Sequence, residues 1–194
     1  MVGRKYRKYP ERLAKSLKNG DLEGFSEVKR HANTLVEFDT IDLSERDLSG
    51  VDLNSVIMTN VNLSKSNFTN SNLGKLKMSG DLSGVIMYNA TLFRSDLSNS
   101  KIYLSDLRNA SLQFSQWENV DLWEADLTGA NISEADLNDA YLAEANLAGA
   151  NFNGVRIEGT FFSYQSPIEA IYTSMNSSKV RLLDSDMKER SSSS

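Results

Sequence analysis

Large apolar residues recur at every fifth position of the segment DLTGANISEADLNDAYLAEANLAGANF, residues 126–152. They are Leu127, Ile132, Leu137, Leu142, Leu147 and Phe152. A helix repeats every 3.6 residues and a strand every two, so a step of five gives neither a stripe along a helix nor one face of a flat strand. A fixed period without either phase is typical of a solenoid, whose repeats bury apolar side chains by stacking on one another.

Each of these large apolar residues is the centre of a five-residue repeat. The residue two before the centre is small, as at Ala130 and Ala135, and the residue one before it is mostly polar, as at Asn131 and Asp136. The chain therefore alternates inward, outward and inward over three extended residues. The remaining two residues are left to turn a corner.

The second residue after each centre is predicted to lie at this corner. Gly or Asn occupies 12 of the 25 corner positions, and both residues accept the positive φ that a type II turn requires. The 12 positions are Gly50, Asn60, Asn70, Gly84, Asn89, Asn99, Asn109, Asn119, Gly129, Gly149, Gly154 and Gly159. The corner chemistry thus agrees with the five-residue period.

The repeat frame contains one irregularity. Centres fall at every fifth residue from Leu43 to Met78 and again from Leu82 onwards, which gives 25 repeats, but Met78 and Leu82 are only four residues apart. We expect a tightened corner at Ser79 and Gly80, because glycine gives the backbone the freedom to omit a residue. A looped-out repeat is the alternative.

The repeats ADLTG, ADLND and ANLAG resemble the pentapeptide-repeat family, whose consensus is Ala, then Asp or Asn, then Leu, then two variable residues. The resemblance covers about residues 39–162. It implies an all-β solenoid, a right-handed quadrilateral β-helix with four repeats in each coil. The array then forms about six coils, and a spacing of about 4.8 Å between stacked strands gives a rod about 30 Å tall.

The segments on either side of the repeats are predicted to cap the two ends of the solenoid, because exposed strands invite pairing with other chains. Residues 1–38 predict a basic cap of two short helices. Residues 163–183 predict a C-terminal capping helix, whose capping box places Ser166 at the start and Glu169 three residues later. This helix either covers the last coil or joins two copies into a homodimer. Residues 184–194 have no apolar period and are predicted to be disordered.

The composition and the start of the chain show no export or membrane feature. The chain has no cysteine, which excludes disulfides, thiol nucleophiles and cysteine metal sites and fits a reducing compartment. The basic start MVGRKYRKYPERL leads into no apolar stretch typical of a secretory signal, and no apolar run is long enough to cross a bilayer. We therefore expect a cytoplasmic protein that does not contact a membrane.

Charge is distributed unevenly along the chain, whose formal net charge is -5. Residues 1–38 carry nine Lys and Arg against five Asp and Glu, whereas residues 39–162 carry eight against 17. No Lys or Arg lies between Arg108 and Arg156. The acidic residues in this interval that form a candidate surface are Glu118, Asp121, Glu124, Asp126, Glu134, Asp136, Asp139 and Glu144. They amount to about one charge per 1.4 Å of rod, compared with about 1.7 Å in duplex DNA.

The acidic interval has two explanations. For some members of the family, the resemblance implies an acidic rod that mimics DNA, occupies the DNA-binding surface of a type II topoisomerase such as gyrase and protects the enzyme from poisons. A four-sided coil, however, distributes these residues over all four sides: Asp121 and Glu144 on one, Asp126 on the next, Glu134 on the third, and Asp136 and Glu118 on the fourth. The charge then encircles the rod, which favours a role in solubility.

Four aromatic residues form a second candidate surface. Tyr103 and Trp123 each follow a centre and are 20 residues apart, and Tyr141 and Phe161 each precede a centre and are also 20 apart. Four repeats per coil place all four residues on one side of the rod, pointing outward. Such an aromatic stripe is typical of a protein-binding surface. Stacking between adjacent strands, or cover by the C-terminal helix, explains the same pattern without a partner.

The sequence offers little catalytic chemistry. Its one histidine, His31, lies in a predicted front helix, and no phosphate loop, metal-ligand spacing or nucleophile motif is present. Asp106 and Asp126, one coil apart, form a carboxylate pair that would suit a cation, but two solvated charges are the simpler interpretation. We therefore predict no enzyme, no metal site and no cofactor.

The predicted function is a non-catalytic scaffold or adaptor that binds an unidentified protein partner through the β-helix surface. The alternative is a DNA mimic that binds and protects gyrase. Direct binding of nucleic acid by the basic run from Arg4 to Lys8 is not expected, because the acidic repeats repel phosphate. The chain is predicted to be a monomer or a homodimer through the C-terminal helix.

Overall fold

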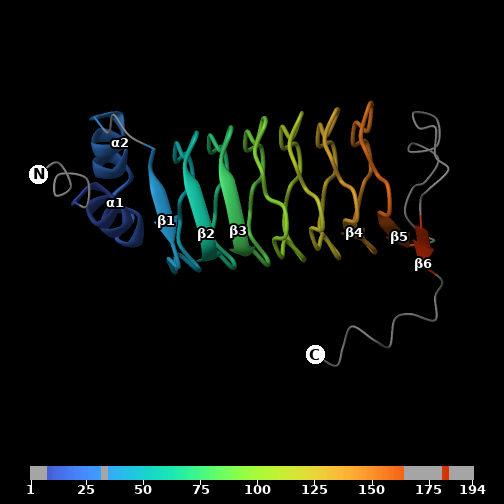
Figure 1. The fold of residues 1–194 in the computed structure, drawn as a ribbon, viewed down its shortest axis with the longest axis horizontal. Helices are drawn as coiled ribbons and strands as arrows, with labels where there is room; N and C mark the ends of the chain where they lie inside the picture. Colours follow the sequence, from blue (N-terminus) through green and yellow to red (C-terminus); the bar gives the residue numbers. More distant parts are fainter. Residues whose placement is uncertain (1–7, 32–34, 164–180, 184–194) are drawn as a thin grey trace, which may run out of the picture.

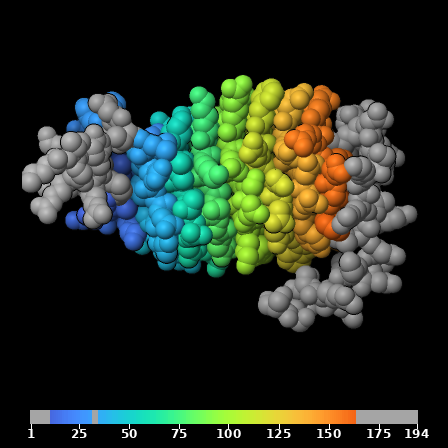
Figure 2. All heavy atoms as spheres, viewed as in Figure 1, coloured from blue at the N-terminus to red at the C-terminus, as the bar shows by residue number. Residues whose placement is uncertain are grey.

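The computed structural model describes residues 8–31, 35–163 and 181–183 of the chain. Two helices, α1 (Lys8–Lys18) and α2 (Leu22–His31), stand at one end of a rod of stacked coils (Figure 1). The strands are β1 (Glu37–Asp39), β2 (Ile57–Asn62), β3 (Lys77–Asp81), β4 (Tyr141–Leu142), β5 (Phe161–Ser163) and β6 (Arg181–Leu183). Figure 2 shows the coils as successive bands along the rod, in the order of the sequence.

Strands of neighbouring coils pair in parallel, and most paired residues are 20 positions apart. Phe38 of β1 lies opposite Met58 of β2, and Tyr141 of β4 lies opposite Phe161 of β5. Isolated bridges continue the same register between the named strands. Twenty residues hold four repeats of five, so each coil has four sides, and the predicted quadrilateral β-helix is confirmed.

One coil, residues 120–139, gives the sides and corners of the rod their names. In chain order, the sides are the Leu122, Leu127, Ile132 and Leu137 sides. The corners that follow them are the Glu124, Gly129, Glu134 and Asp139 corners. Other coils repeat these positions at steps of 20 residues, with one residue omitted near Gly80.

The centres and the small residues two before them fill the inside of the rod. Trp117, at a centre position, is 1% exposed, as the sequence frame predicts. Its indole Nε1 donates a hydrogen bond of 2.6 Å to Ser115 Oγ, so the polar nitrogen has a partner inside the core. Each fully buried large apolar side chain contributes roughly 1.5–3 kcal/mol to folding, so a column of centres is the main stabilising element.

The irregularity at Gly80 is a tightened corner. Pairing between β2 and β3 continues on both sides of it, with Met58 opposite Met78 and Val61 opposite Gly80. No repeat is therefore looped out, and the expected explanation is confirmed. Gly80 has a φ of 144°, and a Cβ placed on it would lie 2.1 Å from the Val61 carbonyl oxygen. Only glycine allows the two backbones to approach this closely.

All 12 corners predicted from Gly or Asn have a positive φ. A positive φ also occurs at corners that carry other residues, where the residue type in the sequence did not predict it. These residues are Glu45, Ser55, Lys65, Lys75, Arg94, Leu104, Phe114, Glu124, Glu134, Asp139 and Glu144. The cause is the hydrogen bond between coils, as from Leu104 N to the Trp123 carbonyl at 2.9 Å, which fixes the corner whatever side chain it carries.

The two helices occupy the front of the rod, where the sequence predicts two short helices. Leu13 and Leu17 of α1 and Phe25 of α2 are fully buried. Lys29 Nζ ties α2 to the coils through the Asp52 carbonyl at 2.8 Å and the Asp52 carboxylate at 3.1 Å. No helix among the described residues has the length and apolar character needed to span a bilayer.

The ends of the coiled region differ from the predicted boundaries. Strand β1 begins at Glu37, two residues before the predicted start at residue 39, because Phe38 acts as a further buried centre and is 5% exposed. At the other end, Arg181–Leu183 form β6 and pair with β5, where the sequence predicted the close of a capping helix. The rest of that helix and the tail 184–194 lie outside the described residues.

Replacing Gly80 with Ala is expected to destabilise the protein by on the order of 3 kcal/mol or more, because the new methyl group collides with the Val61 backbone. Gly50→Ala is the matched control. Gly50 also has a positive φ, 71°, but its Cβ would meet no atom within 4 Å, so only the left-handed conformation costs energy, about 1 kcal/mol. Urea unfolding of both variants measures the difference. Equal losses would contradict the tightened corner.

Candidate interaction surfaces

Tyr141 and Phe161, the upper pair of predicted aromatic residues, are in contact on the Leu122 side. Their ring centroids lie 6.1 Å apart with an interplanar angle of 43°, and their strands β4 and β5 are paired. Both side chains are half-buried. Burial raises the pKa of the Tyr141 phenol above its usual value, and the negative charges of Asp121 and Glu144 add to the effect. This pair stacks between adjacent coils, as one of the two explanations predicts.

Tyr103 and Trp123, the lower pair, occupy successive positions of one column on the same Leu122 side. The backbone shows the register, because Leu104 N, next to Tyr103, donates to the Trp123 carbonyl at 2.9 Å. Both aromatic side chains are half-buried, and Leu104 at the Glu124 corner is 52% exposed. Tyr103, Leu104 and Trp123 together form an apolar patch, here called the Tyr103 patch.

The eight candidate acidic residues are spread over three sides and three corners of the rod. Glu124 and Glu144 follow each other in the column of the Glu124 corner, whereas Glu134 and Asp139 occupy two other corners. The other four lie on sides: Asp121 on the Leu122 side, Asp126 on the Leu127 side, and Glu118 and Asp136 on the Leu137 side. The structure therefore brings together only one pair of corner carboxylates.

The aspartates one before a centre have a structural role. Their Oδ1 atoms accept a hydrogen bond from the backbone N–H two residues later, as from Trp123 to Asp121 at 3.1 Å and from Thr128 to Asp126 at 2.9 Å. Such bonds close the turn that begins the corner. The repeat therefore requires these side chains whether or not a partner binds them.

Two of the acidic residues are paired with arginines that the sequence places outside the acidic interval. Arg156 Nη1 lies 2.8 Å from Oδ2 of Asp136, which belongs to the preceding coil. Arg108 Nε lies 3.9 Å from Oδ2 of Asp126, which belongs to the following coil. Coiling thus brings two arginines next to acidic residues of an interval that contains no Lys or Arg in the sequence. The estimate of one negative charge per 1.4 Å of rod is therefore too high for the charge that is left unpaired by arginine.

Arg108 is the centre of a polar cluster on the Leu127 side. Its Nε donates to Asp106 Oδ1 at 2.8 Å and its Nη2 to Asp106 Oδ2 at 2.7 Å, and the guanidinium carbon lies 5.5 Å from the Tyr88 ring centroid. The hydrogen bonds from Arg108 lower the pKa of the Asp106 carboxyl. The guanidinium lies near both Asp106 and Asp126, so the protein itself supplies the positive charge that this carboxylate pair would attract.

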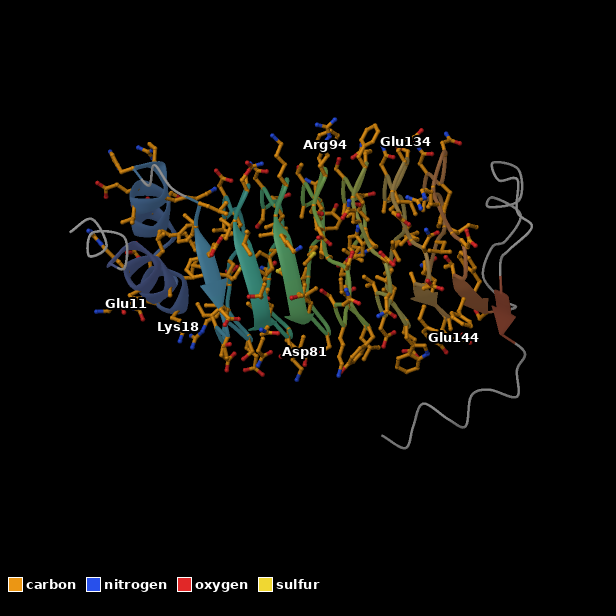
Figure 3. The ribbon with its side chains drawn as sticks, viewed as in Figure 1. Glu11, Lys18, Asp81, Arg94, Glu134 and Glu144 are labelled. Atoms are coloured by element: carbon orange, nitrogen blue, oxygen red, sulfur yellow. The ribbon has the colours of Figure 1, made fainter. Side chains whose placement is uncertain are left out.

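Gly and Asn predominate at two diagonally opposite corners, whereas the other two corners carry mostly longer side chains. At the Gly129 and Asp139 corners, amides of successive coils bond to each other, as from Asn89 Nδ2 to Asn70 Oδ1 at 2.7 Å. The column of the Glu124 corner is Glu45, Lys65, Gly84, Leu104, Glu124 and Glu144. The column of the Glu134 corner is Ser55, Lys75, Arg94, Phe114, Glu134 and Gly154. Figure 3 shows Arg94 and Glu134 along one edge of the rod and Glu144 along the opposite edge.

A cluster of Phe93, Arg94 and Phe114 lies at the Glu134 corner. The two rings meet edge to face, with centroids 5.6 Å apart and an angle of 77°. The Arg94 guanidinium carbon lies 5.1 Å from the centroid of Phe93 and 5.8 Å from that of Phe114. Phe114 is 50% exposed and has a φ of 59°, a conformation that is unfavourable for a bulky side chain.

The sequence frame did not identify this cluster. It compared aromatic residues 20 positions apart, but Phe93 and Phe114 are 21 positions apart, because one lies one residue after its centre and the other two residues after. The available signal was the residue type at the corner. Phe114 and Leu104 are large apolar residues at positions where the other coils carry Gly, Ser or a charged residue.

The described residues contain no group of three or more His, Asp or Glu that would suit a metal ion. His31 is exposed at the end of α2, and its Nδ1 lies 2.8 Å from the Glu27 carbonyl oxygen of the same helix. Its position is that of a surface residue at a helix end, away from the aromatic and acidic surfaces.

The fold and its surfaces define a four-sided parallel β-solenoid, with longer corner side chains mainly along two opposite edges. The sequence pattern described as "Pentapeptide repeats" matches residues 41–80, 105–142 and 125–163, in eight copies. The chain belongs to the pentapeptide-repeat family. The fold of this family is a right-handed quadrilateral β-helix, in agreement with the coils described above.

Solved structures of other pentapeptide-repeat proteins are similar to this chain. HetL, which is involved in heterocyst differentiation regulation in the cyanobacterium Nostoc sp. strain PCC 7120, is 22% identical, with 71% of this chain and 83% of HetL covered and a TM-score of 0.31. The protein alr5209 from Nostoc PCC 7120 is 25% identical, with 60% and 84% covered and a TM-score of 0.40. QnrB1, a plasmid-mediated fluoroquinolone resistance protein, is 15% identical, with 80% and 84% covered and a TM-score of 0.39. No curated protein gives a significant match.

Replacing Arg108 with Met is expected to lower stability at neutral pH and to have a smaller effect in acid. The folded-state pKa of Asp106 is lowered from its ordinary 3.8, so the stability that the ion pair provides is present above pH 3.8 and is lost as the pH falls through the folded-state value. Urea midpoints at pH 7 and at about pH 2 measure this dependence.

Arg94→Met is the control for this experiment. Arg94 lies over the Phe93 and Phe114 rings, so its contribution is not expected to follow the titration of Asp106. An Arg108→Met loss that is as large in acid as at pH 7 would show that the cluster acts by packing and not through the charge of Asp106.

Proposed function

We propose that this protein is a non-catalytic scaffold that binds another protein through the Leu122 side of its β-helix. The observation that carries the proposal is the Tyr103 patch, in which Leu104 is 52% exposed between two half-buried aromatic residues of successive coils. Exposed apolar residues beside aromatic rings are typical of the centre of a protein interface. The proposal keeps the cytoplasmic location that was predicted from the sequence and needs no cofactor.

The corner conformation adds support to this proposal. Leu104 has a φ of 58°, which costs a bulky residue roughly 1–2 kcal/mol relative to glycine. Glycine or asparagine would be cheaper at this position, and both occur at other corners of the same rod. A strained and exposed apolar residue is better explained by contact with a partner than by stability.

The alternative function, a DNA mimic that binds and protects gyrase, has weaker support. Glu124 and Glu144 form a short acidic column, as a mimic requires, but the other six candidate carboxylates lie elsewhere around the rod. The pairing of Asp126 and Asp136 with arginines reduces the free charge further. A duplex mimic needs a continuous acidic strip, so the aromatic surface is the preferred binding site.

Changing Tyr103 and Trp123 to Ser is expected to abolish capture of a protein partner, with at least a tenfold loss of affinity as is typical of central aromatic residues at interfaces. Capture by the immobilised full chain, followed by titration of the purified partner, measures the loss. Tyr88→Ser is the control, because Tyr88 is an exposed tyrosine, 39% accessible, on the neighbouring Leu127 side. Unchanged binding by the double variant, or a collapse of its melting curve, would contradict the proposed site.

If the alternative is correct, the protein at micromolar concentration should alter supercoiling by gyrase and relieve its inhibition by a quinolone. Glu124→Gln with Glu144→Gln should then remove the effect, because these two residues form the acidic column. The absence of any effect of the wild-type protein on supercoiling, with or without the drug, would exclude the DNA-mimic function.

A further inference from the structure

The side chains of the Glu134 corner change from basic through aromatic to acidic along the rod. Lys75 and Arg94 lie in the coils nearer the helices, Phe114 lies in the next coil, and Glu134 lies one coil further towards β5. All four side chains are exposed. Arg94 and Glu134 project along the same edge in Figure 3. The edge therefore has a positive half and a negative half, with the Phe93, Arg94 and Phe114 cluster between them.

Such an edge is complementary to a second copy of itself in the opposite direction. A two-fold axis perpendicular to the rod, between the coils of Arg94 and Phe114, places Lys75 opposite Glu134 of the second copy. The same axis places Arg94 opposite Phe114 of that copy, and both contacts occur twice because the interface is isologous. A parallel arrangement would instead place like charges opposite each other, which is unfavourable.

The cluster at the middle of the edge has the composition of an interface core. The two phenylalanine rings and the guanidinium are already arranged against one another, with the distances given above, so little ordering is needed on association. Aromatic residues and arginine are the types enriched at the centres of interfaces. Phe114 is half exposed despite its unfavourable φ, as Leu104 is in the Tyr103 patch.

The flanking column of the Leu137 side does not share this charge order, because Lys77, Asp96, Gln116, Asp136 and Arg156 follow one another along it. Its charges are paired within the chain, Lys77 with Asp96 at 3.4 Å and Asp136 with Arg156 at 2.8 Å, so the asymmetry lies in the Glu134 corner itself. The opposite edge is less suitable. The described residues of the Glu124 corner, from Glu45 to Glu144, include no aromatic residue, and Glu45 interrupts the basic half.

We propose that two copies of this chain associate side by side and antiparallel through the Glu134 corner. The Glu134 corner is diagonally opposite the Glu124 corner, so the Leu122 side with its Tyr103 patch faces away from the second copy. The dimer would therefore present two partner-binding surfaces at once, which raises the avidity for a partner that itself has two sites. The dimer does not depend on the proposed function, and each can be tested without the other.

Sedimentation velocity of the full chain at up to about 100 µM, a range suited to small and transient interfaces, is expected to show a dimer that weakens as salt is added. Phe114→Asn should weaken the dimer at least about tenfold without lowering the melting temperature, because Asn tolerates the positive φ better than Phe. Leu104→Asn is the matched control, with the same change at a corner of the opposite edge, and should leave the dimer intact.

Exchange of charges tests the antiparallel direction. Lys75→Glu and Glu134→Lys should each weaken the dimer, because each places like charges opposite one another. An equal mixture of the two variants should form a heterodimer, and the double variant K75E/E134K should recover the homodimer, since both restore opposite charges at each contact.

Three results would overturn the proposal. The first is a wild-type chain that remains monomeric throughout the concentration range at low salt. The second is a dimer that survives both Phe114→Asn and the single charge changes, because its interface would then lie elsewhere. The third is a failure of the mixed or double variants to recover the association that the single variants lose.

Discussion

The parallel hydrogen bonds between successive coils are the constraint on which the rest of the structure depends. The backbone of each centre bonds to the coil above, as from Leu107 N to the Asp126 carbonyl at 2.7 Å. These bonds hold residues of equal position in one column, so that every centre packs on the centres of the neighbouring coils. The hydrogen bonds therefore set the core, the corners and the composition of each side together.

The four corner columns share this constraint on their backbone but differ in the side chains that they carry. Apart from the tightened corner at Gly80, the described corners adopt nearly the same conformation, and two of the four columns meet this requirement mainly with Gly and Asn and with amides that bond between coils. The other two columns carry Lys, Arg, Leu, Phe and Glu at some cost in backbone energy. Since the four columns share one backbone path, they differ only in their side chains, and the longer corner side chains lie mainly along two opposite edges.

Charge on this rod must be considered in three dimensions. The acidic interval of the sequence is bounded by Arg108 and Arg156, and coiling returns each of them to within one coil of an aspartate in the interval. The aspartates of the repeat are also used by the turns that they close. A resemblance to DNA based on charge per length therefore overestimates the free negative surface, whereas the order of charges along one corner becomes visible only after coiling.

The sequence by itself determined a solenoid of five-residue repeats, the residues that face inward and the 12 Gly and Asn corners, because each depends on a pattern that repeats locally along the chain. The single break in that pattern indicated the tightened turn at Gly80, and the number of four repeats in each coil came from the resemblance to the pentapeptide-repeat family. The sequence also placed the four predicted aromatic residues on one side, since that follows from the 20-residue coil. Only the tertiary structure decided which side chains meet between coils. Phe93 and Phe114 are 21 residues apart, and Arg108 and Asp126 are 18 apart, so their contacts depend on the direction in which each side chain leaves its column. A period in the sequence fixes the backbone columns, but it does not fix those directions.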